Sequence, residues 1–107
     1  MSALFDWADR PEREVFPGFH GRFIHSGRMT FARWRIDAGA VLPEHSHEHE
    51  QVVHVFAGEI EMVVDGKRTV CGPSTVLVIP SNARHSGRAL SDCVVIDAFA
   101  PVREDYK

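Results

Sequence analysis

The chain has 107 residues, which suffices for one compact domain and is too short for two. Hydrophobic residues make up 44% of it, which argues against a disordered chain, and the net charge of -3 provides no basic surface for nucleic acid or an anionic membrane. No stretch approaches the roughly 18 apolar residues that span a bilayer, and the N-terminus does not resemble a signal peptide. We therefore expect a cytoplasmic protein that binds neither nucleic acid nor membrane.

Residues 1–18 show little periodicity and end in the turn signal Pro17-Gly18, so we expect them to form an N-terminal arm. Residues 19–107 alternate short runs of β-branched and aromatic residues with turn signals, which is typical of an all-β sandwich or barrel. The tail from Arg103 to Lys107 is polar and is expected to fray unless Arg103 has a function. The expected strands are Phe19 to His25, Met29 to Ile36, Gln51 to Phe56, Glu59 to Val64, Lys67 to Val70, Thr75 to Ile79 and Cys93 to Phe99.

Two of these runs carry more detailed local signals. Asp65-Gly66 separates two expected strands, and Asp-Gly is the preferred pair for a two-residue type I′ hairpin turn. Around Trp34 and Ile36 the charged residues alternate with the apolar ones, as in a strand with one buried face. The pattern predicts that Trp34 and Ile36 point into the core.

Histidine is unevenly distributed, since four of the seven histidines lie within ten residues, at positions 45, 47, 49 and 54. In a strand, His45 and His47 would present their imidazoles on one face about 6.5 to 7 Å apart, close enough to bind one ion. Gln51 has the same parity, and an antiparallel barrel can bring the distant His85 opposite these residues. Three imidazoles and one amide oxygen suit one divalent transition metal ion, with nickel, zinc, iron and manganese all compatible.

The other histidines are assigned differently. His49 has the parity of a ligand, but we expect it at the rim of the pocket. Glu50 has the opposite parity and is expected to point away, unless a bulge exchanges it with Gln51. An isolated histidine more often has a structural role than a metal-binding one, so we expect His20, His25 and His54 to be structural or surface residues.

The segment from Gly39 to Gln51, closing on Gly58, resembles the first motif of the cupin family. That motif reads Gly-x5-His-x-His-x3-Glu-x6-Gly, and Gln51 stands here at the position of the Glu. The resemblance implies a single cupin barrel, a jelly roll or double-stranded β-helix, over residues 19–107. It also implies a metal site on His45, His47 and Gln51.

The second cupin motif, Gly-x5-Pro-x-Gly-x2-His-x3-Asn, is matched more loosely. Gly72, Pro80 and His85 are present, although the first gap is longer, and Ala89 stands for the Asn. Asn82 stands for the second Gly, and asparagine adopts a left-handed backbone more readily than most residues. The second motif adds His85 as the fourth predicted ligand.

The end of the chain, from Val95 to Tyr106, looks like the last segment of KdgF-type pectin-degradation cupins. These cupins convert 4,5-unsaturated monouronates from pectin or alginate breakdown into linear keto sugars. They combine a metal site of three His and one Gln with an Asp, a Phe two residues later and an Arg four residues after that. The resemblance gives these catalytic roles to Asp97, Phe99 and Arg103 and implies a small anionic sugar as substrate.

The residue types suit this chemistry. Neutral Gln51 in place of Glu leaves the site more positive, which favours an anionic substrate and the stabilisation of charge on the ring oxygen. Asp97 lies in an apolar run, so we expect burial to raise its pKa and to suit it for shuttling a proton. The alternative is a structural role, in which Asp97 hydrogen-bonds to the backbone or pairs with an arginine. Arg103 is expected to clamp a carboxylate with two hydrogen bonds, or to be a solvated tail charge. Phe99 is expected in the core or as a stacking platform.

Two other functions fit the same residues. A small-molecule dioxygenase would hold iron on the same four ligands, and a non-catalytic sugar or metabolite sensor would use the barrel for binding alone. Edge strands and an apolar N-terminal arm also favour a homodimer.

Overall fold

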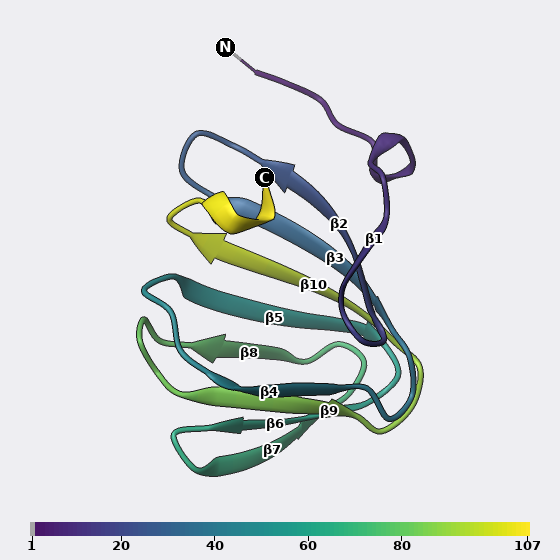
Figure 1. The fold of residues 1–107 in the computed structure, drawn as a ribbon, viewed down its shortest axis with the longest axis vertical. Coiled ribbons are helices and arrows are strands. Elements are labelled where there is room, and N and C mark those ends of the chain that lie inside the picture. Colours follow the sequence, from purple (N-terminus) through teal and green to yellow (C-terminus); the bar gives the residue numbers. More distant parts are fainter. Residues whose placement is uncertain (1) are drawn as a thin grey trace.

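The computed structural model describes residues 2–107, which form ten strands and two short 3-10 helices (Figure 1). No helix in this part of the chain is long and apolar enough to cross a membrane. The 3-10 helices are η1 (Trp7–Asp9) and η2 (Glu104–Tyr106). The strands are β1 (Arg13–Phe16), β2 (Phe19–His25), β3 (Thr30–Ile36), β4 (Val41–His45), β5 (Glu50–Ala57), β6 (Ile60–Val64), β7 (Lys67–Cys71), β8 (Val76–Ile79), β9 (His85–Ala89) and β10 (Cys93–Ala100).

The strands form two sheets in which every pairing is antiparallel. One sheet has six strands in the order β1-β2-β3-β10-β5-β8, and the other has four in the order β4-β9-β6-β7. The chain passes repeatedly from one sheet to the other, so strands far apart in sequence become neighbours (Figure 1). This two-sheet arrangement confirms the expected all-β class.

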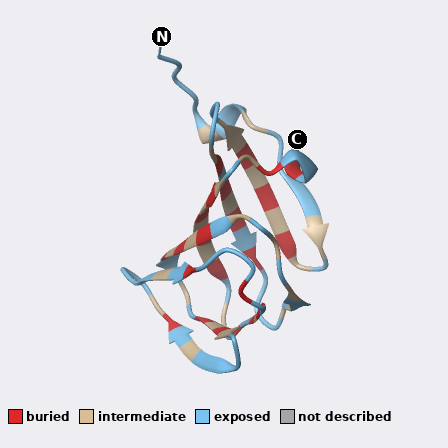
Figure 2. Ribbon diagram, turned by 90° about the vertical axis from the view of Figure 1, so that its left-hand side faces the viewer, coloured by how far each residue is buried: buried red, intermediate tan, exposed pale blue. Residues whose placement is uncertain are grey.

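The hydrophobic core lies between the sheets, because side chains alternate between the two faces of each strand. In β10 every second residue is buried, and Figure 2 shows this alternation as bands along the strands. Trp34 and Ile36 are 4% and 2% exposed, so the prediction that both point inward is confirmed. Burial of each large apolar side chain stabilises the fold by roughly 1.5–3 kcal/mol.

The hairpin between β6 and β7 turns at Asp65-Gly66, as predicted. Both residues have positive φ angles, 48° and 81°, as a type I′ turn requires. The turn also contacts the segment before β9. The backbone N–H of Asp65 donates to the Arg84 carbonyl at 2.8 Å, and the Asp65 side chain accepts from the Arg84 N–H at 3.1 Å. The Asp65-Gly66 turn therefore helps to fix the backbone of Arg84, the residue before His85.

Three strands were not predicted, β1, β4 and β9, and two of them, β4 and β9, carry predicted metal ligands. Strand β4 contains Pro43 and polar residues, and β9 contains Gly87 and no β-branched residue, so neither has a strong strand signal. They pair with each other at one edge of the four-stranded sheet. Their pairing is therefore a result of tertiary structure.

Both ends of the chain are more ordered than the sequence predicted. Part of the expected N-terminal arm, Arg13–Phe16, forms β1 and pairs with β2. The prediction of a fraying C-terminal tail was wrong, because η2 packs on the barrel and buries Tyr106 to 8% exposure. An aromatic side chain within the polar tail supplies the apolar area that holds this turn in place.

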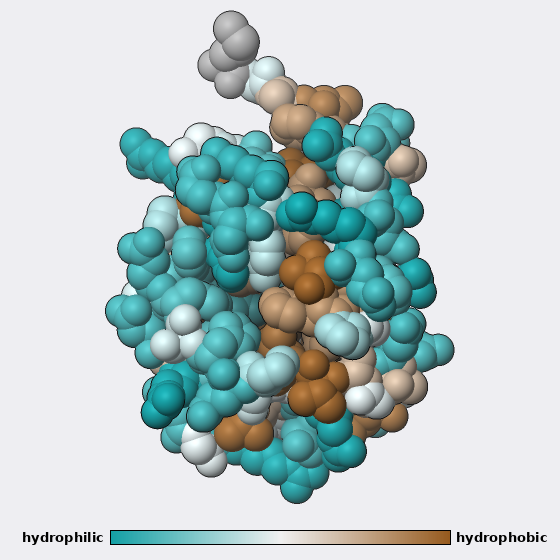
Figure 3. Space-filling view, viewed as in Figure 1, coloured by the Kyte–Doolittle hydropathy of each residue, from teal (hydrophilic) through white to brown (hydrophobic). Residues whose placement is uncertain are grey.

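Some large apolar side chains stay exposed. Val76 and Val78 on the edge strand β8 are 55% and 56% exposed, and Leu4 near the N-terminus is 98% exposed. In Figure 3 apolar side chains form a central strip between hydrophilic margins. The homodimer expected from the edge strands and the arm stays a prediction.

Candidate metal centre

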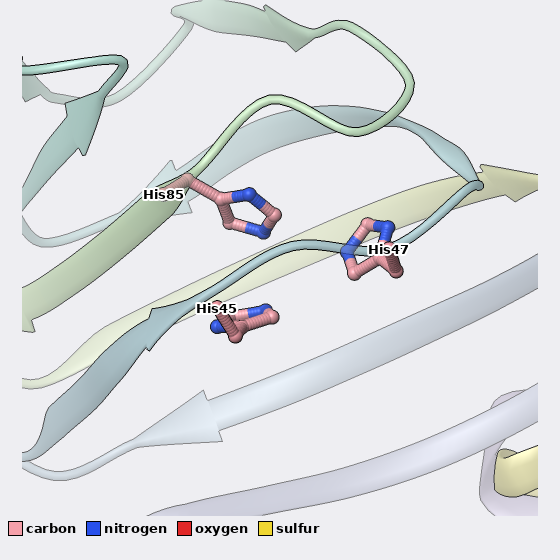
Figure 4. Close-up of side chains that lie close together, drawn as sticks. All are labelled: His45, His47 and His85. Carbon is pink, nitrogen blue, oxygen red and sulfur yellow. The ribbon is translucent and has the colours of Figure 1, made fainter.

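Three histidine rings meet where β4 ends and β9 begins. His45 and His85 are register partners across the two strands, and their ring centroids are 4.2 Å apart. His47 follows β4, with its ring centroid 5.5 Å from that of His45 and 4.9 Å from that of His85. One nitrogen of each ring lies within 4.8 Å of the others, and Figure 4 shows the three rings around a common space. The structure thus brings together the three predicted histidines.

His47 reaches this cluster in a way that the sequence did not predict. The expectation of His45 and His47 on one face of a single strand was wrong, because β4 ends at His45. The His47 carbonyl instead accepts a hydrogen bond of 2.8 Å from the backbone N–H of Asn82. Asn82 has a φ of 66°, the left-handed conformation expected at this position of the turn. The loop before β9 therefore fixes the backbone of His47.

The three imidazoles share one tautomer. In each ring Nδ1 lies within hydrogen-bond distance of a backbone carbonyl oxygen two residues away. Because a carbonyl oxygen only accepts, Nδ1 carries the proton and the lone pair is left on Nε2. Such hydrogen bonds orient metal-binding histidines in proteins. The pairs are His45 with Pro43 at 2.8 Å, His47 with His49 at 3.0 Å and His85 with Ala83 at 2.9 Å.

The lone pairs of these nitrogens suit a bound cation. Nε2 of His85 is buried and has no hydrogen-bond partner among the described residues. The side-chain oxygen of Gln51 lies 3.2 Å from Nε2 of His47, so two acceptors face each other with no proton between them. An unsatisfied buried polar atom costs about 1–3 kcal/mol, and a divalent ion between these atoms would remove that cost. The residues present therefore fit one divalent transition metal ion.

The imidazoles of His47 and His85 are neutral near pH 7, as metal binding requires. Burial, with smaller contributions from the nearby Arg103 and His85, lowers the pKa of His47 to about 4. Burial also lowers the pKa of His85, and His45 and Arg103 act in the same direction. Protons therefore do not compete strongly with a metal for these two nitrogens at neutral pH.

Asp97 is a buried carboxyl group beside this cluster, on strand β10. Its side chain accepts a hydrogen bond from Nε1 of Trp34 at 3.0 Å through Oδ2, while Oδ1 has no partner among the described residues. Burial raises the pKa of Asp97 to about 7, against the opposing effects of the Gln51 and Trp34 side chains and the Arg103 charge. The predicted rise of the pKa is confirmed. The strand pattern predicted that Trp34 lies in the core, but it did not indicate the hydrogen bond to Asp97.

Arg103 is 8% exposed, so the expectation of a solvated tail charge was wrong. The guanidinium carbon lies 4.7 Å from the centre of the Phe99 ring and 4.2 Å from that of Tyr106. Phe99 itself is 2% exposed and packs edge-on against His47 at 5.9 Å between centroids. Nε and Nη2 of Arg103 donate to the carboxylate of Asp105 at 2.9 and 2.7 Å. The sequence did not point to Asp105 or Tyr106, which had been placed in a fraying tail.

One cavity between the sheets connects the metal centre with these residues. Its lining combines His45 and Gln51 with Asp97 and Arg103, and the rest of the wall is mainly apolar. Phe99 also lines this space. A small anionic molecule in the cavity would contact an arginine, a buried carboxyl group and two predicted metal ligands.

Comparison with known proteins gives relatives of the same architecture. The family model described as "Cupin domain" matches residues 32–99. The pectin degradation protein KdgF of Dickeya dadantii (strain 3937) is 31% identical over 70 residues, and the match covers 64% of this chain and 64% of that protein, just under two thirds of its length.

Two solved structures match the whole chain. KdgF from Halomonas sp. is 29% identical, with full coverage of both chains and a TM-score of 0.93. An RmlC-like cupin from Shewanella frigidimarina is 23% identical, with 100% of this chain and 97% of that chain covered and a TM-score of 0.93, which shows a common fold. The predicted resemblance to KdgF-type cupins is thus confirmed. Because the family model covers more than half of the chain and the two antiparallel sheets form the matching barrel, the protein belongs to the cupin family.

Proposed function

We propose that this cupin is a metal-dependent enzyme that converts 4,5-unsaturated monouronates into linear keto sugars by ring opening and tautomerisation. The observation that carries the proposal is the single cavity in which His45 and Gln51 lie together with Asp97 and Arg103. Similarity to KdgF over the full length of the chain supports it. The substrates are sugars from pectin or alginate breakdown.

The charge of the site favours an anionic sugar. None of the four predicted ligands is a carboxylate or a thiolate, so they do not offset the charge of a bound ion, and Arg103 adds one more positive charge to the cavity. When bound, a divalent ion, whether nickel, zinc, iron or manganese, would supply Lewis acidity for the ring opening.

We assign the proton transfer of the reaction to Asp97. Its Oδ1 takes the proton of the anomeric hydroxyl while the bond between the anomeric carbon and the ring oxygen breaks. The anomeric carbon becomes an aldehyde, and the ring oxygen becomes part of an enolate. The carboxyl group then returns the proton to the alkene carbon C4, which leaves a ketone at C5. Atoms and charge balance without a co-reactant, so the net reaction is an isomerisation.

The neighbouring side chains bind and enclose the sugar. Arg103 holds the substrate carboxylate, and Phe99 forms part of the wall beside it. The apolar remainder of the cavity limits the access of water, which strengthens these charge interactions.

The test is incubation of the purified protein with 4,5-unsaturated galacturonate and guluronate, following the loss of alkene absorbance and the product by NMR. Chelator-treated protein and Asp97→Asn serve as matched controls, and elemental analysis identifies the metal. An alkene that disappears only at the uncatalysed rate would contradict the proposal. Oxygen consumption with an organic substrate would instead support the dioxygenase, and tight binding without turnover would support the sensor.

A further inference from the structure

We infer that Asp105 is a positioning residue of this site, which holds the Arg103 guanidinium by one edge so that its Nη1 side meets the carboxylate of the ligand. The inference rests on the proposed function only for the identity of that ligand as a uronate. The sequence pattern predicted that Arg103 clamps a carboxylate with two hydrogen bonds, and it did not predict a protein partner for this side chain.

The geometry of the pair is that of a two-point ion pair. Nε of Arg103 donates to Oδ1 of Asp105 at 2.9 Å, and Nη2 donates to Oδ2 at 2.7 Å. These bonds take the side of the guanidinium formed by Nε and Nη2, which is one of the two edges that can bind a carboxylate in this way. The three remaining N–H donors of Arg103, two on Nη1 and one on Nη2, form the other such edge, and we expect a ligand carboxylate in the cavity to bind there.

The two partners differ in exposure. The Arg103 side chain is 10% exposed and lines the cavity, whereas the Asp105 side chain is 58% exposed. The carboxylate therefore lies on the outer side of the pair. Such a buried cation requires a partner even when no ligand is bound, and Asp105 supplies it.

The turn that carries Asp105 is anchored at both ends. The backbone N–H of Arg103 donates to Oγ1 of Thr30 on β3 at 2.9 Å, and Thr30 is fully buried. The carbonyl of Tyr106 accepts from Nη2 of Arg13 on β1 at 2.7 Å. The Tyr106 ring also packs against Phe23, with 4.8 Å between centroids. Because the sheet fixes both ends of the turn, the Asp105 carboxylate has a defined place relative to Arg103.

Whether removal of the Asp105 carboxylate strengthens or weakens anion binding distinguishes a positioning role from a purely electrostatic one. If Asp105 acted only as a negative charge near the cavity, its removal would strengthen the binding of an anion. If Asp105 positions Arg103, its removal frees a long side chain with several rotatable bonds, and binding of the anion weakens. The two possibilities therefore predict opposite changes in KM.

The first measurement uses the ligand-free protein and needs no activity. The Nε–H resonance of Arg103 in a 1H-15N spectrum is assigned by its loss in Arg103→Lys. We expect this resonance to exchange slowly with water in the wild type and at least about 10-fold faster in Asp105→Ala, because the acceptor is gone. Glu104→Gln is the matched control, since Glu104 lies in the same turn and pairs with Lys107. An unchanged exchange rate in Asp105→Ala would overturn the inference.

The second measurement is steady-state kinetics with 4,5-unsaturated galacturonate. We expect Asp105→Ala and Asp105→Asn to raise KM roughly 10-fold with kcat changed much less, because orientation of a binding group is lost. Glu104→Gln should keep the KM of the wild type. A KM for Asp105→Asn equal to or below that of the wild type would contradict positioning. Metal content and circular dichroism check that each variant is folded and loaded.

The two proposals fail in different ways. If the wild type does not turn over any unsaturated uronate, the proposed function is wrong, and titration with saturated D-galacturonate replaces the kinetics. We then expect roughly 10-fold weaker binding by Asp105→Ala than by the wild type. Equal affinities, or no binding of the carboxylate by the wild type, would overturn the role of Asp105.

Discussion

The indole N–H of Trp34 donates a hydrogen bond of 3.0 Å to the carboxyl group of Asp97 inside the barrel. The two residues lie on the neighbouring strands β3 and β10, where Trp34 is the register partner of Val95 and Asp97 that of Ala32. This diagonal contact engages Oδ2 and leaves Oδ1 without a partner among the described residues. Oδ1 is therefore the oxygen that can accept a proton from a bound substrate.

We predict that Trp34→Phe raises the pKa of Asp97 further. The indole N–H stabilises the ionised carboxylate, so its loss favours the protonated form. The acidic limb of the kcat/KM profile should move to higher pH, and the free energy of unfolding should fall by about 1–3 kcal/mol. The control is Trp7→Phe, which changes the other tryptophan. An unshifted pH profile would show that the contact does not tune Asp97.

Asp97→Asn tests the proton transfer. Asparagine keeps the shape and a hydrogen-bonding group but cannot exchange a proton, so kcat should fall by roughly 10² to 10⁴. Metal content should stay normal, since Asp97 is not a predicted ligand. Steady-state kinetics on an unsaturated uronate measures the effect, and an undiminished kcat would remove Asp97 from the mechanism.

The same variant should change the pH dependence of stability of the metal-free protein. The pKa of Asp97 is raised to about 7 in the folded state, so the wild type loses stability as pH rises from about 4 through about 7. Asp97→Asn lacks this ionisation, and its unfolding free energy relative to the wild type should increase over that window by on the order of 3 kcal/mol. Urea unfolding at pH 4.5, 6 and 8 measures it, with the exposed Glu104→Gln as control. A constant difference across the three pH values would argue against the raised pKa.

His47→Ala removes one of the predicted ligands. We expect metal affinity to fall by at least about 100-fold, while circular dichroism shows that the barrel stays folded. The control is His54→Ala on β5, where the His54 ring packs on Phe56 with 4.2 Å between centroids. Elemental analysis after dialysis against a chelator measures the effect, and full occupancy in His47→Ala would contradict the site assignment.

Gln51→Glu adds a negative charge to the centre. We expect metal to be retained, because a carboxylate is also a ligand, and turnover of an anionic substrate to fall by roughly 10- to 100-fold, because the added charge opposes its carboxylate. If metal content and turnover both match the wild type, the neutral charge of Gln51 does not favour an anionic substrate, although the protein can still be this enzyme.

The sequence by itself determined the features that depend on local geometry. The type I′ turn at Asp65-Gly66 follows from the positive φ angles that this pair adopts, and the burial of Trp34 and Ile36 follows from the two-residue period of a strand. The all-β class follows from the same alternation repeated along the chain. Motif spacing pointed to the cupin barrel and to the three histidines that meet in the structure.

Only the tertiary structure decided which side chains meet. The pairing of β4 with β9 sets His45 against His85, forty residues away, although neither strand has a strong signal of its own. The contact between Trp34 and Asp97 depends on the register of β3 against β10. Asp105 is only two residues from Arg103, yet their pairing depends on a turn that distant strands hold in place. Local sequence sets backbone preferences, whereas the packing of distant elements sets the partner, exposure and pKa of each side chain in the site.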